Sequence, residues 1–305
     1  MKLWDSQEIF DILENKIQKR FLIDNISIDS RSLEEGDLFI ALRGEKFDGH
    51  DFVYEAFKRG ASAVIINKNK TKKYNDSFFK DKTLIAVNNT LVFLKSLAKK
   101  SRKRPKNLKT IGITGSSGKT SVKDWISFIL SKGFKVHKNP GNFNNQIGLP
   151  LTLSRMKSDT EICILEIGMN KPGEISILSR IAKPDISIIT NIGPAHIGNF
   201  KNIDGIVEEK ASIINSSNLT LIPRDSKKFN LLKNHAIKKS KKYFTFGFSN
   251  YSDFQISEIK KINDSENIVT FKLQDVQLNV KLKVQANHWY INILILLSVI
   301  KFKKL

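Results

Sequence analysis

The sequence predicts an α/β protein built mainly on a mostly parallel, doubly wound sheet. Two runs, EICILEIG (161–168) and DISIITNIG (185–193), are continuously apolar, as in strands that are covered on both faces. Helical segments separate such runs along the chain, and a glycine-rich loop joins a further apolar run to a helix. This alternation is typical of a parallel sheet with helices on both faces.

Residues 1–88 are predicted to form a small α/β domain. It opens with a short helix, because Asp5 and Glu8 make a capping-box pattern ahead of a helical apolar stripe. A second helix is expected in the segment that Gly60 ends. That helix is expected at 51–61, and three strands are expected from short apolar runs at 37–42, 62–67 and 83–88.

Residues 89–107 are predicted to be a hinge helix and linker that leads into a second domain at 108–305. The basic stretch with Pro105 suits a hinge. The second domain begins with the strand KTIGITG (109–115), the glycine loop, and a helix that Gly133 ends. The buried stripe of that helix is predicted to consist of Val122, Trp125, Ile126, Ile129 and Leu130.

The last third of the sequence changes pattern. One more strand is expected at 220–225, and alternating residues between 243 and 284 predict an antiparallel extension of the sheet. The run INILILLSVI (291–300) is much shorter than the about 20 residues that cross a bilayer, so a buried helix is expected. Cys163 is the only cysteine and lies in an apolar run, which predicts a core position and excludes an internal disulfide.

The composition sets limits on partners and location. The 305 residues carry a formal net charge of +21, which can indicate binding to nucleic acid. The lysines are scattered among Asn and Ile, however, and no zinc-finger or RNA-binding motif accompanies them, so we expect no nucleic-acid partner. No signal peptide is recognisable, and we expect a cytoplasmic protein without membrane insertion.

The stretch TGSSGKTS (114–121) follows a predicted strand and opens a predicted helix. Ile113 stands where the common P-loop pattern has glycine, but Gly115 and Gly118 still let the backbone approach an anion. Lys119 adds positive charge, and Thr120 is placed to offer its hydroxyl to Mg²⁺. Because similar turns occur without a ligand, the loop alone does not establish function.

Polar side chains follow other predicted strands, at the edge where open α/β sheets bind ligands. Glu166 near the end of a buried strand would be costly unless it were paired or bound to a metal. His196 follows another strand, and Lys210 lies on the next predicted helix. Each has an ordinary structural explanation, as a hydrogen-bonded loop histidine or a surface lysine. Together with a phosphate loop, they indicate a nucleotide and metal site.

The sequence resembles the Mur ligase superfamily, ATP-dependent enzymes that form amide bonds in peptidoglycan precursors. The family's loop has the shorter form T-G-x-x-G-K-[ST], which residues 114–120 match. Within the superfamily, GNFNNQIGLPLTL (141–153), GMNKPGEI (168–175) and TNIGPAHIGNF (190–200) most resemble the branch that adds D-alanyl-D-alanine. The segment 28–65 is similar to the part that holds the UDP end of the substrate in this family.

The resemblance implies roles for individual residues. Lys119 would contact the β- and γ-phosphates of ATP, Thr120 and Glu166 would hold one Mg²⁺, and His196 would help to hold a second. Lys210 matches the lysine that becomes carbamylated in this family, which would make it a carboxylate-like metal ligand. The catalytic residues would be Lys119, His196 and Lys210, and the nucleotide-binding residues Gly115, Ser116, Ser117, Gly118, Lys119, Thr120, Ser121, His288 and Asn292.

The resemblance also implies where the base and the substrate bind. ANHWYIN (286–292) is similar to the family's G-x-H-x-x-x-N, with Ala286 in place of glycine, and would bring His288 and Asn292 near the adenine. The residues expected at the UDP site are Ser30 and Arg31, and those expected on the substrate side of the ATP site are Asn144 and Asn145.

The implied reaction is the addition of D-alanyl-D-alanine to UDP-MurNAc-tripeptide through an acyl phosphate, with ATP and Mg²⁺ as cofactors. Family members continue into a Rossmann-like C-terminal domain, whereas this sequence stops at SVIKFKKL (298–305). The expectation is therefore that the third domain is absent or supplied by a separate chain. Little or no ligase turnover is expected from the 305 residues alone.

Two alternatives remain open at the level of sequence. The first is another ligase of the superfamily, such as a MurE-like enzyme or a folylpolyglutamate synthetase. The second is a truncated, non-catalytic protein that binds nucleotide or nucleic acid. The residues that choose the incoming amine lie mostly in the family's third domain, so the sequence does not decide between ligases.

Overall fold

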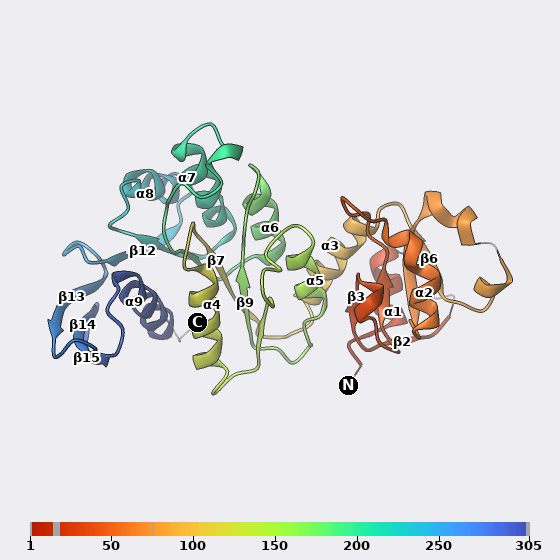
Figure 1. Cartoon of the computed structure of the whole chain (residues 1–305), viewed down its shortest axis with the longest axis horizontal. Helices are drawn as coiled ribbons and strands as arrows, with labels where there is room; N and C mark the ends of the chain where they lie inside the picture. Colours follow the sequence, from red (N-terminus) through yellow and green to blue (C-terminus); the bar gives the residue numbers. More distant parts are fainter. Residues whose placement is uncertain (1, 15–18, 75, 303–305) are drawn as a thin grey trace. The chain divides into compact units, whose positions relative to one another are not determined.

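The chain folds into two compact units in the computed structural model, which describes residues 2–14, 19–74 and 76–302 (Figure 1). The first unit comprises Met1–Lys106 and Pro150–Asp159, and the second comprises Asn107–Leu149 and Thr160–Leu305. The helix expected in a linker, α3 (Thr90–Ser101), thus belongs to the first unit. A later segment of the chain also returns to that unit, which the sequence pattern does not indicate.

The first unit is built on a four-stranded parallel sheet in the order β3-β4-β5-β6. All three predicted strands form, as do both predicted helices. The capping box is present, because the Glu8 amide donates to Asp5 Oδ1 at 2.9 Å and the Asp5 amide donates to Glu8 Oε2 at 3.2 Å. The elements are β1 Trp4–Asp5, α1 Ser6–Leu13, β2 Leu22–Ile23, β3 Ile26–Ser27, η1 Ser30–Ser32, β4 Leu38–Ile40, η2 Gly49–Phe52, α2 Val53–Lys58, β5 Ala63–Asn67, η3 Lys68–Tyr74, η4 Ser77–Phe79, β6 Leu84–Val87 and α3 Thr90–Ser101.

The second unit is built on a nine-stranded sheet in the order β15-β14-β13-β12-β11-β10-β7-β9-β8. The strands from β8 to β13 are parallel, and β13, β14 and β15 form an antiparallel meander. The elements are β7 Lys109–Thr114, α4 Lys119–Leu130, β8 Val136–Lys138, α5 Gly148–Ser154, β9 Ile162–Glu166, α6 Glu174–Ala182, β10 Ile186–Ile189, η5 Ile197–Asn199, α7 Ile203–Ala211, η6 Ser212–Ser216, β11 Leu219–Pro223, α8 Phe229–Lys238, β12 Lys242–Gly247, β13 Phe254–Lys261, β14 Asn267–Leu273, β15 Val276–Leu282 and α9 Asn287–Lys301.

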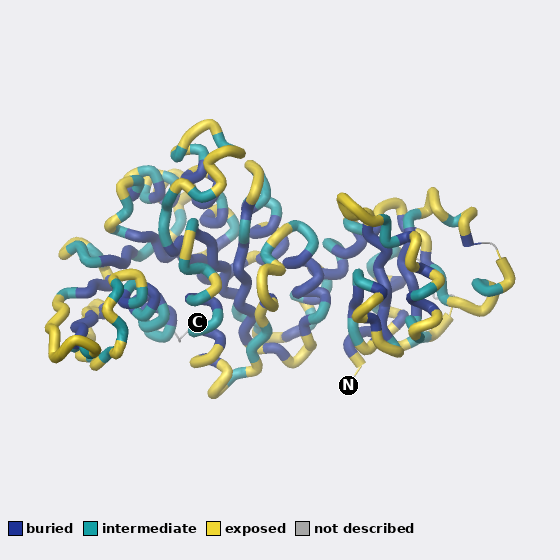
Figure 2. The backbone as a smooth tube through the Cα atoms, viewed as in Figure 1, coloured by how far each residue is buried: buried dark blue, intermediate teal, exposed yellow. Residues whose placement is uncertain are grey.

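Both faces of this sheet are covered, as a doubly wound fold requires. Ile111 and Ile113 of β7 belong to one buried cluster with side chains of α4 and α9. Gly112 points to the opposite face, where a Cβ would come within 3.4 Å of Ile213 in η6. The central strands are accordingly buried along their length, whereas exposed residues gather in the loops and on the antiparallel meander (Figure 2).

The structure corrects two details of the predicted fold and adds a strand that was not predicted. Ile129, assigned to the buried stripe of α4, is 40% exposed, and Trp125 is only partly buried. Strand β12, placed in the antiparallel extension, pairs in parallel with β11, so the extension begins at β13. The short strand β8 has no clear apolar pattern because it lies at the sheet edge.

Two predictions about the apolar runs are confirmed. Cys163 is completely buried within β9. The run 291–300 lies in α9, where Leu294, Ile295 and Val299 face the core. Among the residues that the structure describes, no helix combines the length and apolar character needed to cross a bilayer.

Candidate functional site

The register of three neighbouring strands brings several of the predicted site residues to one edge of the second unit's sheet. Ile113 near the end of β7 pairs with Glu166 at the end of β9, and Thr114 pairs with Ile189 at the end of β10. The glycine loop leaves β7 directly after Thr114. Because parallel strands end at a common edge, the loop lies between the segments that follow β9 and β10, which is where open α/β sheets bind ligands.

Glycine is required at two positions of the loop by local geometry. Gly115 has a φ of +149°, and a Cβ there would lie 1.9 Å from Thr190 Oγ1. Gly118 has a φ of +79°, and its Cβ would lie 3.2 Å from Asn292 Oδ1 on α9. Thus the loop needs these glycines for its own packing as well as for the approach of an anion.

Two residues after β10 hold the loop, and the sequence patterns did not single them out. Asn191 Oδ1 accepts hydrogen bonds from the amides of Ser116 at 3.0 Å and Ser117 at 2.8 Å, and Asn191 Nδ2 donates to Ser117 Oγ at 2.6 Å. Thr190 Oγ1 donates to the Ser117 carbonyl at 2.6 Å. The available signals were the position of both residues directly after a buried strand and their place at the start of the motif TNIGPAHIGNF (190–200).

Lys119 begins α4 and folds back over the loop. Its Nζ donates to the Gly115 carbonyl at 2.9 Å. Burial lowers the pKa of Lys119, and the charge of Glu166 partly offsets this effect. The amides in the first turn of α4 have no acceptor within the helix, so the loop presents a positive charge and free donors at one point.

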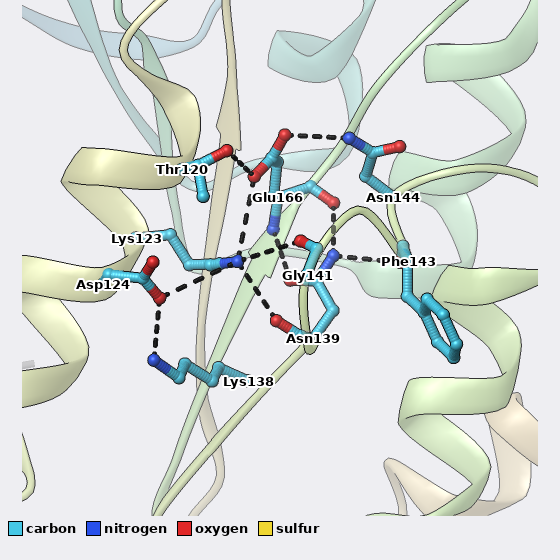
Figure 3. Close-up of polar contacts among 9 residues, drawn as sticks. All are labelled: Thr120, Lys123, Asp124, Lys138, Asn139, Gly141, Phe143, Asn144 and Glu166. Atoms are coloured by element: carbon cyan, nitrogen blue, oxygen red, sulfur yellow. Dashed lines mark hydrogen bonds and ion pairs between the residues drawn. The ribbon is translucent and has the colours of Figure 1, made fainter.

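Glu166 is buried, with 3% exposure, and both of its carboxylate oxygens are hydrogen-bonded (Figure 3). Thr120 Oγ1 donates to Oε2 at 2.7 Å, and Asn144 Nδ2 donates to Oε1 at 2.8 Å. The Nζ of Lys123 lies 3.8 Å from Oε2. The prediction that this carboxylate needs a partner is confirmed, but the charged partner is Lys123, which no sequence pattern indicated.

A pocket of about 280 Å³ joins the glycine loop to His196 and Lys210. His196 lies in its wall, exposed and with a φ of +64°. Lys210 also lines the pocket and is 2% exposed, so the alternative of a surface lysine is wrong. The pocket is lined by Gly115, Lys119, Asn142, Asn144, Asn145, Gly168, Met169, Asn170, Glu174, His196 and Lys210.

The electrostatics of Lys210 are unusual for a lysine. Burial, followed by repulsion from Lys119, lowers its pKa to about 7, while Glu209 acts in the opposite direction. Glu209 itself accepts hydrogen bonds from the amides of Gly173 and Ile175, both at 2.7 Å. Because that carboxylate is committed to the start of α6, the Lys210 amine forms no hydrogen bond or ion pair among the residues that the structure describes.

The residues expected at the base of the nucleotide lie on α9. Asn292 is buried beside Gly118, and His288 is exposed with its ring 5.0 Å from that of Trp289. Trp289 in turn stacks on Trp125 of α4, with ring centroids 5.2 Å apart.

Asn191, which holds the glycine loop, also lines a second cavity of about 610 Å³. Its lining also includes Gly193, Pro223, Asp225, Phe246, Phe248 and Ile291.

Three further predicted site residues are Asn145, Ser30 and Arg31. Asn145 lines the pocket, but its Oδ1 accepts from the amides of Ile147 and Gly148, which opens α5. Ser30 and Arg31 belong to the first unit, in the short helix η1. Ser30 is buried, whereas the Arg31 side chain is 86% exposed and forms an ion pair with Asp29 at 2.7 Å.

The oxygen donors beside the loop fit Mg²⁺ bound together with phosphate. Among the described residues, no group of three His, Cys, Asp or Glu side chains is arranged to hold a metal. Mg²⁺, however, commonly keeps several waters and takes one or two carboxylates together with substrate phosphates. The adjacent hydroxyl of Thr120 and carboxylate of Glu166 are donors of this kind.

Comparison with known proteins places this arrangement in a family. Residues 113–300 match the family model described as the Mur ligase middle domain. The chain belongs to the Mur ligase family. Residues 22–102 of this Mur ligase also match the model described as Mur ligase family, catalytic domain.

Individual relatives of this Mur ligase carry a common description. The UDP-N-acetylmuramoyl-tripeptide--D-alanyl-D-alanine ligase of Bacillus subtilis is 36% identical over 283 residues, covering 92% of this chain and 59% of the relative. MurF from Acinetobacter baumannii has a TM-score of 0.86 at 26% identity, covering 100% of this chain and 66% of that one. MurF from Thermotoga maritima, solved in complex with ADP, has a TM-score of 0.79 at 28% identity, covering 92% and 63%. This Mur ligase chain thus spans about three fifths to two thirds of these relatives' lengths.

Proposed function

We propose that this chain carries the ATP site and the UDP-substrate site of a ligase that adds D-alanyl-D-alanine to UDP-MurNAc-tripeptide. The observation that carries the proposal is the pocket in which the glycine loop meets Asn144 and Lys210, beside the buried Glu166. The descriptions of the relatives support this choice over the other ligases of the superfamily. Such a reaction would take place in the cytoplasm, where ATP is available.

In the proposed reaction, the terminal carboxylate of the tripeptide attacks the γ-phosphorus of ATP. An acyl phosphate forms and ADP leaves. The amine of D-alanyl-D-alanine then attacks the acyl carbon, loses a proton, and displaces inorganic phosphate as the amide forms. Negative charge gathers at the phosphates in both steps, and Lys119 with the first amides of α4 would offset it.

Thr120 and Glu166 would hold one Mg²⁺, and His196 together with carbamylated Lys210 would hold a second. Bound Mg²⁺ would neutralise phosphate charge during phosphoryl transfer. The hydrogen bond from Thr120 to Glu166 and the position of His196 in the pocket wall support this assignment. Asn144 would orient the carboxylate through its bond to Oε1.

Carbamylation of Lys210 is supported by its surroundings. With a pKa of about 7, a large share of the amine is neutral near physiological pH. The neutral nitrogen can attack CO₂, forming an N–C bond and releasing one proton. The product is an anion, which would replace the repulsion between Lys210 and Lys119 with attraction. A carbon-13 NMR signal from the full chain in labelled bicarbonate, absent in Lys210→Met, would support the modification.

The base of the nucleotide would lie toward α9. The second cavity is largely apolar at Phe246, Phe248 and Ile291, as suits a flat aromatic base, and it shares Asn191 with the loop that would hold the phosphates. His288 and Asn292 would lie at its edge.

In the first unit, the exposed guanidinium of Arg31 suits a diphosphate, which supports Ser30 and Arg31 as the UDP contacts. Asn145 would lie on the substrate side of the pocket, beside Asn144.

The test measures binding first and turnover second. We expect the 305-residue chain to bind ATP more tightly with Mg²⁺ than with EDTA, and to bind UDP-MurNAc-tripeptide. Phosphate release with tripeptide and D-alanyl-D-alanine is then compared with and without the C-terminal domain of a MurF relative added as a separate chain. A chain that binds neither ATP nor the UDP-linked substrate would contradict the proposal.

A further inference from the structure

Lys123 is one of the most deeply buried charged side chains of the second unit, with 1% exposure. It lies on α4, one turn beyond Lys119. A lysine is rarely buried this far unless its charge has dedicated partners, because removing an ammonium from water is costly. The structure therefore raises the question of what Lys123 holds in place.

The ammonium of Lys123 connects three parts of the site. Its Nζ donates to the carbonyls of Asn139 at 3.1 Å and Gly141 at 3.3 Å, and it lies 3.8 Å from Glu166 Oε2. It is also 3.8 Å from Asp124 Oδ1. Figure 3 shows the side chain extending from α4 with its nitrogen between the 139–145 loop and the carboxylate of Glu166.

The 139–145 loop is itself tied to the main chain of Glu166. Asn139 is completely buried, and its Oδ1 accepts from the Glu166 amide at 2.9 Å. Its Nδ2 donates to the carbonyls of Glu166 and Phe143, both at 3.0 Å. Farther along the loop, Asn144 reaches the carboxylate of Glu166. Lys123 and Asn139 thus fix the same short segment from two sides.

We propose that Lys123 is a positioning residue for the metal and phosphate site. Its two bonds to loop carbonyls set the loop that carries Asn144, and its charge holds Glu166 Oε2 beside Thr120. The oxygens that would receive Mg²⁺ are then in place before nucleotide arrives. The inference rests on the proposed function only for the identity of this ligand.

The main experiment measures how nucleotide binding depends on Mg²⁺ in the full chain. A fluorescent ATP analogue is titrated at a series of Mg²⁺ concentrations and in EDTA. Lys123→Met removes the charge and all donors, and we expect the Mg²⁺ concentration for half-maximal binding to rise about tenfold or more, as when an outer-shell partner is lost. Binding in EDTA should stay near the wild-type level. A general folding defect would instead weaken nucleotide binding both with Mg²⁺ and in EDTA.

Lys138→Met is the matched control. Lys138 is an exposed neighbour that pairs with Asp124 at 2.7 Å, and among the described residues it forms no hydrogen bond or ion pair with Glu166. We expect its Mg²⁺ dependence to stay within about twofold of wild type, because exposed ion pairs contribute little. Lys123→Gln, whose amide still donates, should fall between wild type and Lys123→Met. Equal Mg²⁺ dependence in wild type and both Lys123 variants, or failure of both variants to fold, would overturn the proposal.

A second measurement needs no ligand, and so separates this inference from the proposed function. Unfolding midpoints in denaturant are compared for wild type, Lys123→Met, Glu166→Gln and the double variant. If Lys123 acts on Glu166, the midpoint shift caused by Lys123→Met should shrink by about half or more in the Glu166→Gln background, because the pair is removed as a unit. Additive shifts would refute the inference, whereas absent ATP binding by wild type would refute only the proposed function.

Discussion

The two walls of the pocket differ in how completely their polar groups are paired. One, the Glu166 wall, consists of Asn144, which lines the pocket, with Thr120 and Glu166 beside it, and these three side chains share two hydrogen bonds of 2.7 and 2.8 Å. The other, the Lys210 wall, consists of His196 and Lys210, whose side chains form no hydrogen bond or ion pair among the described residues. The side chains of the first wall are already held in position by hydrogen bonds, whereas the second wall holds a buried amine whose protonated form lacks a bonded anion. Binding of an anion there, or conversion of Lys210 into one, would relieve that cost.

The largest expected effect comes from removing the charge of the Glu166 wall. Glu166→Gln removes the buried carboxylate beside Lys123 and leaves that cation only the more exposed Asp124 at 3.8 Å, which should cost about 3 kcal/mol of unfolding free energy. The Mg²⁺-dependent part of ATP binding should also disappear. Denaturant unfolding and nucleotide titration measure the two effects. A variant as stable as wild type would mean that the wall is not electrostatically tied to Lys123.

Gly115→Ala should disturb the loop between the two walls. The new methyl group would meet Thr190 Oγ1 at 1.9 Å, at a φ of +149° that suits glycine. We expect a loss of about 2 kcal/mol in the free energy of unfolding together with weaker nucleotide binding. Gly133→Ala is the control, because no atom lies within 4 Å of its added Cβ. Equal stability of the two variants would contradict the described loop packing.

The Lys210 wall should reveal itself through pH. The pKa of Lys210 is about 7 in the folded chain, below its ordinary value of 10.5, so between these values the unfolded chain binds more protons. Stability should therefore rise with pH in that window, by about 1.4 kcal/mol per pH unit from this group. Below about pH 7 the destabilisation is fully present.

Lys210→Met should remove that rise. Unfolding in CO₂-free buffers at several pH values, for wild type and the variant, measures the difference between the two slopes. Identical slopes would mean that Lys210 keeps an ordinary pKa.

The smallest effect is expected at His196. Its side chain has no bonded partner among the described residues, so His196→Ala should change the free energy of unfolding by less than about 0.5 kcal/mol. Asn144→Ala is the comparison on the Glu166 wall, where loss of the bond to a buried carboxylate should cost about 2 kcal/mol. A larger loss of unfolding free energy in His196→Ala than in Asn144→Ala would contradict the described difference in pairing between the two walls.

Much of this site could be predicted from the sequence, because its residues lie directly after apolar strands. Gly115, Thr120 and Glu166 follow or end such strands, and parallel register alone brings them to one edge. Lys123 was missed because a lysine inside an amphipathic helix gives no sign of being buried. Asn191 was missed because a hydrogen bond to backbone amides far along the chain leaves no periodic pattern.

The fold, too, has features that the sequence predicts and features that it does not. The central strands follow from continuous apolar runs, whereas β8 at the sheet edge does not. The parallel pairing of β12 could not be predicted, because an alternating strand fits either direction. Ile129 remains exposed at the end of α4, although its spacing matches the buried stripe.

The stacked indoles of Trp125 and Trp289 give the chain an internal optical reporter. They join α4, which carries the glycine loop at its start, to α9, which carries His288 and Asn292. Trp4, the remaining tryptophan, lies in the first unit with Arg104 above its ring. Exciton coupling in near-ultraviolet circular dichroism would therefore follow the spacing of α4 and α9 as nucleotide is added. The emission of Trp4, isolated by replacing the other two, would follow the folding of the first unit.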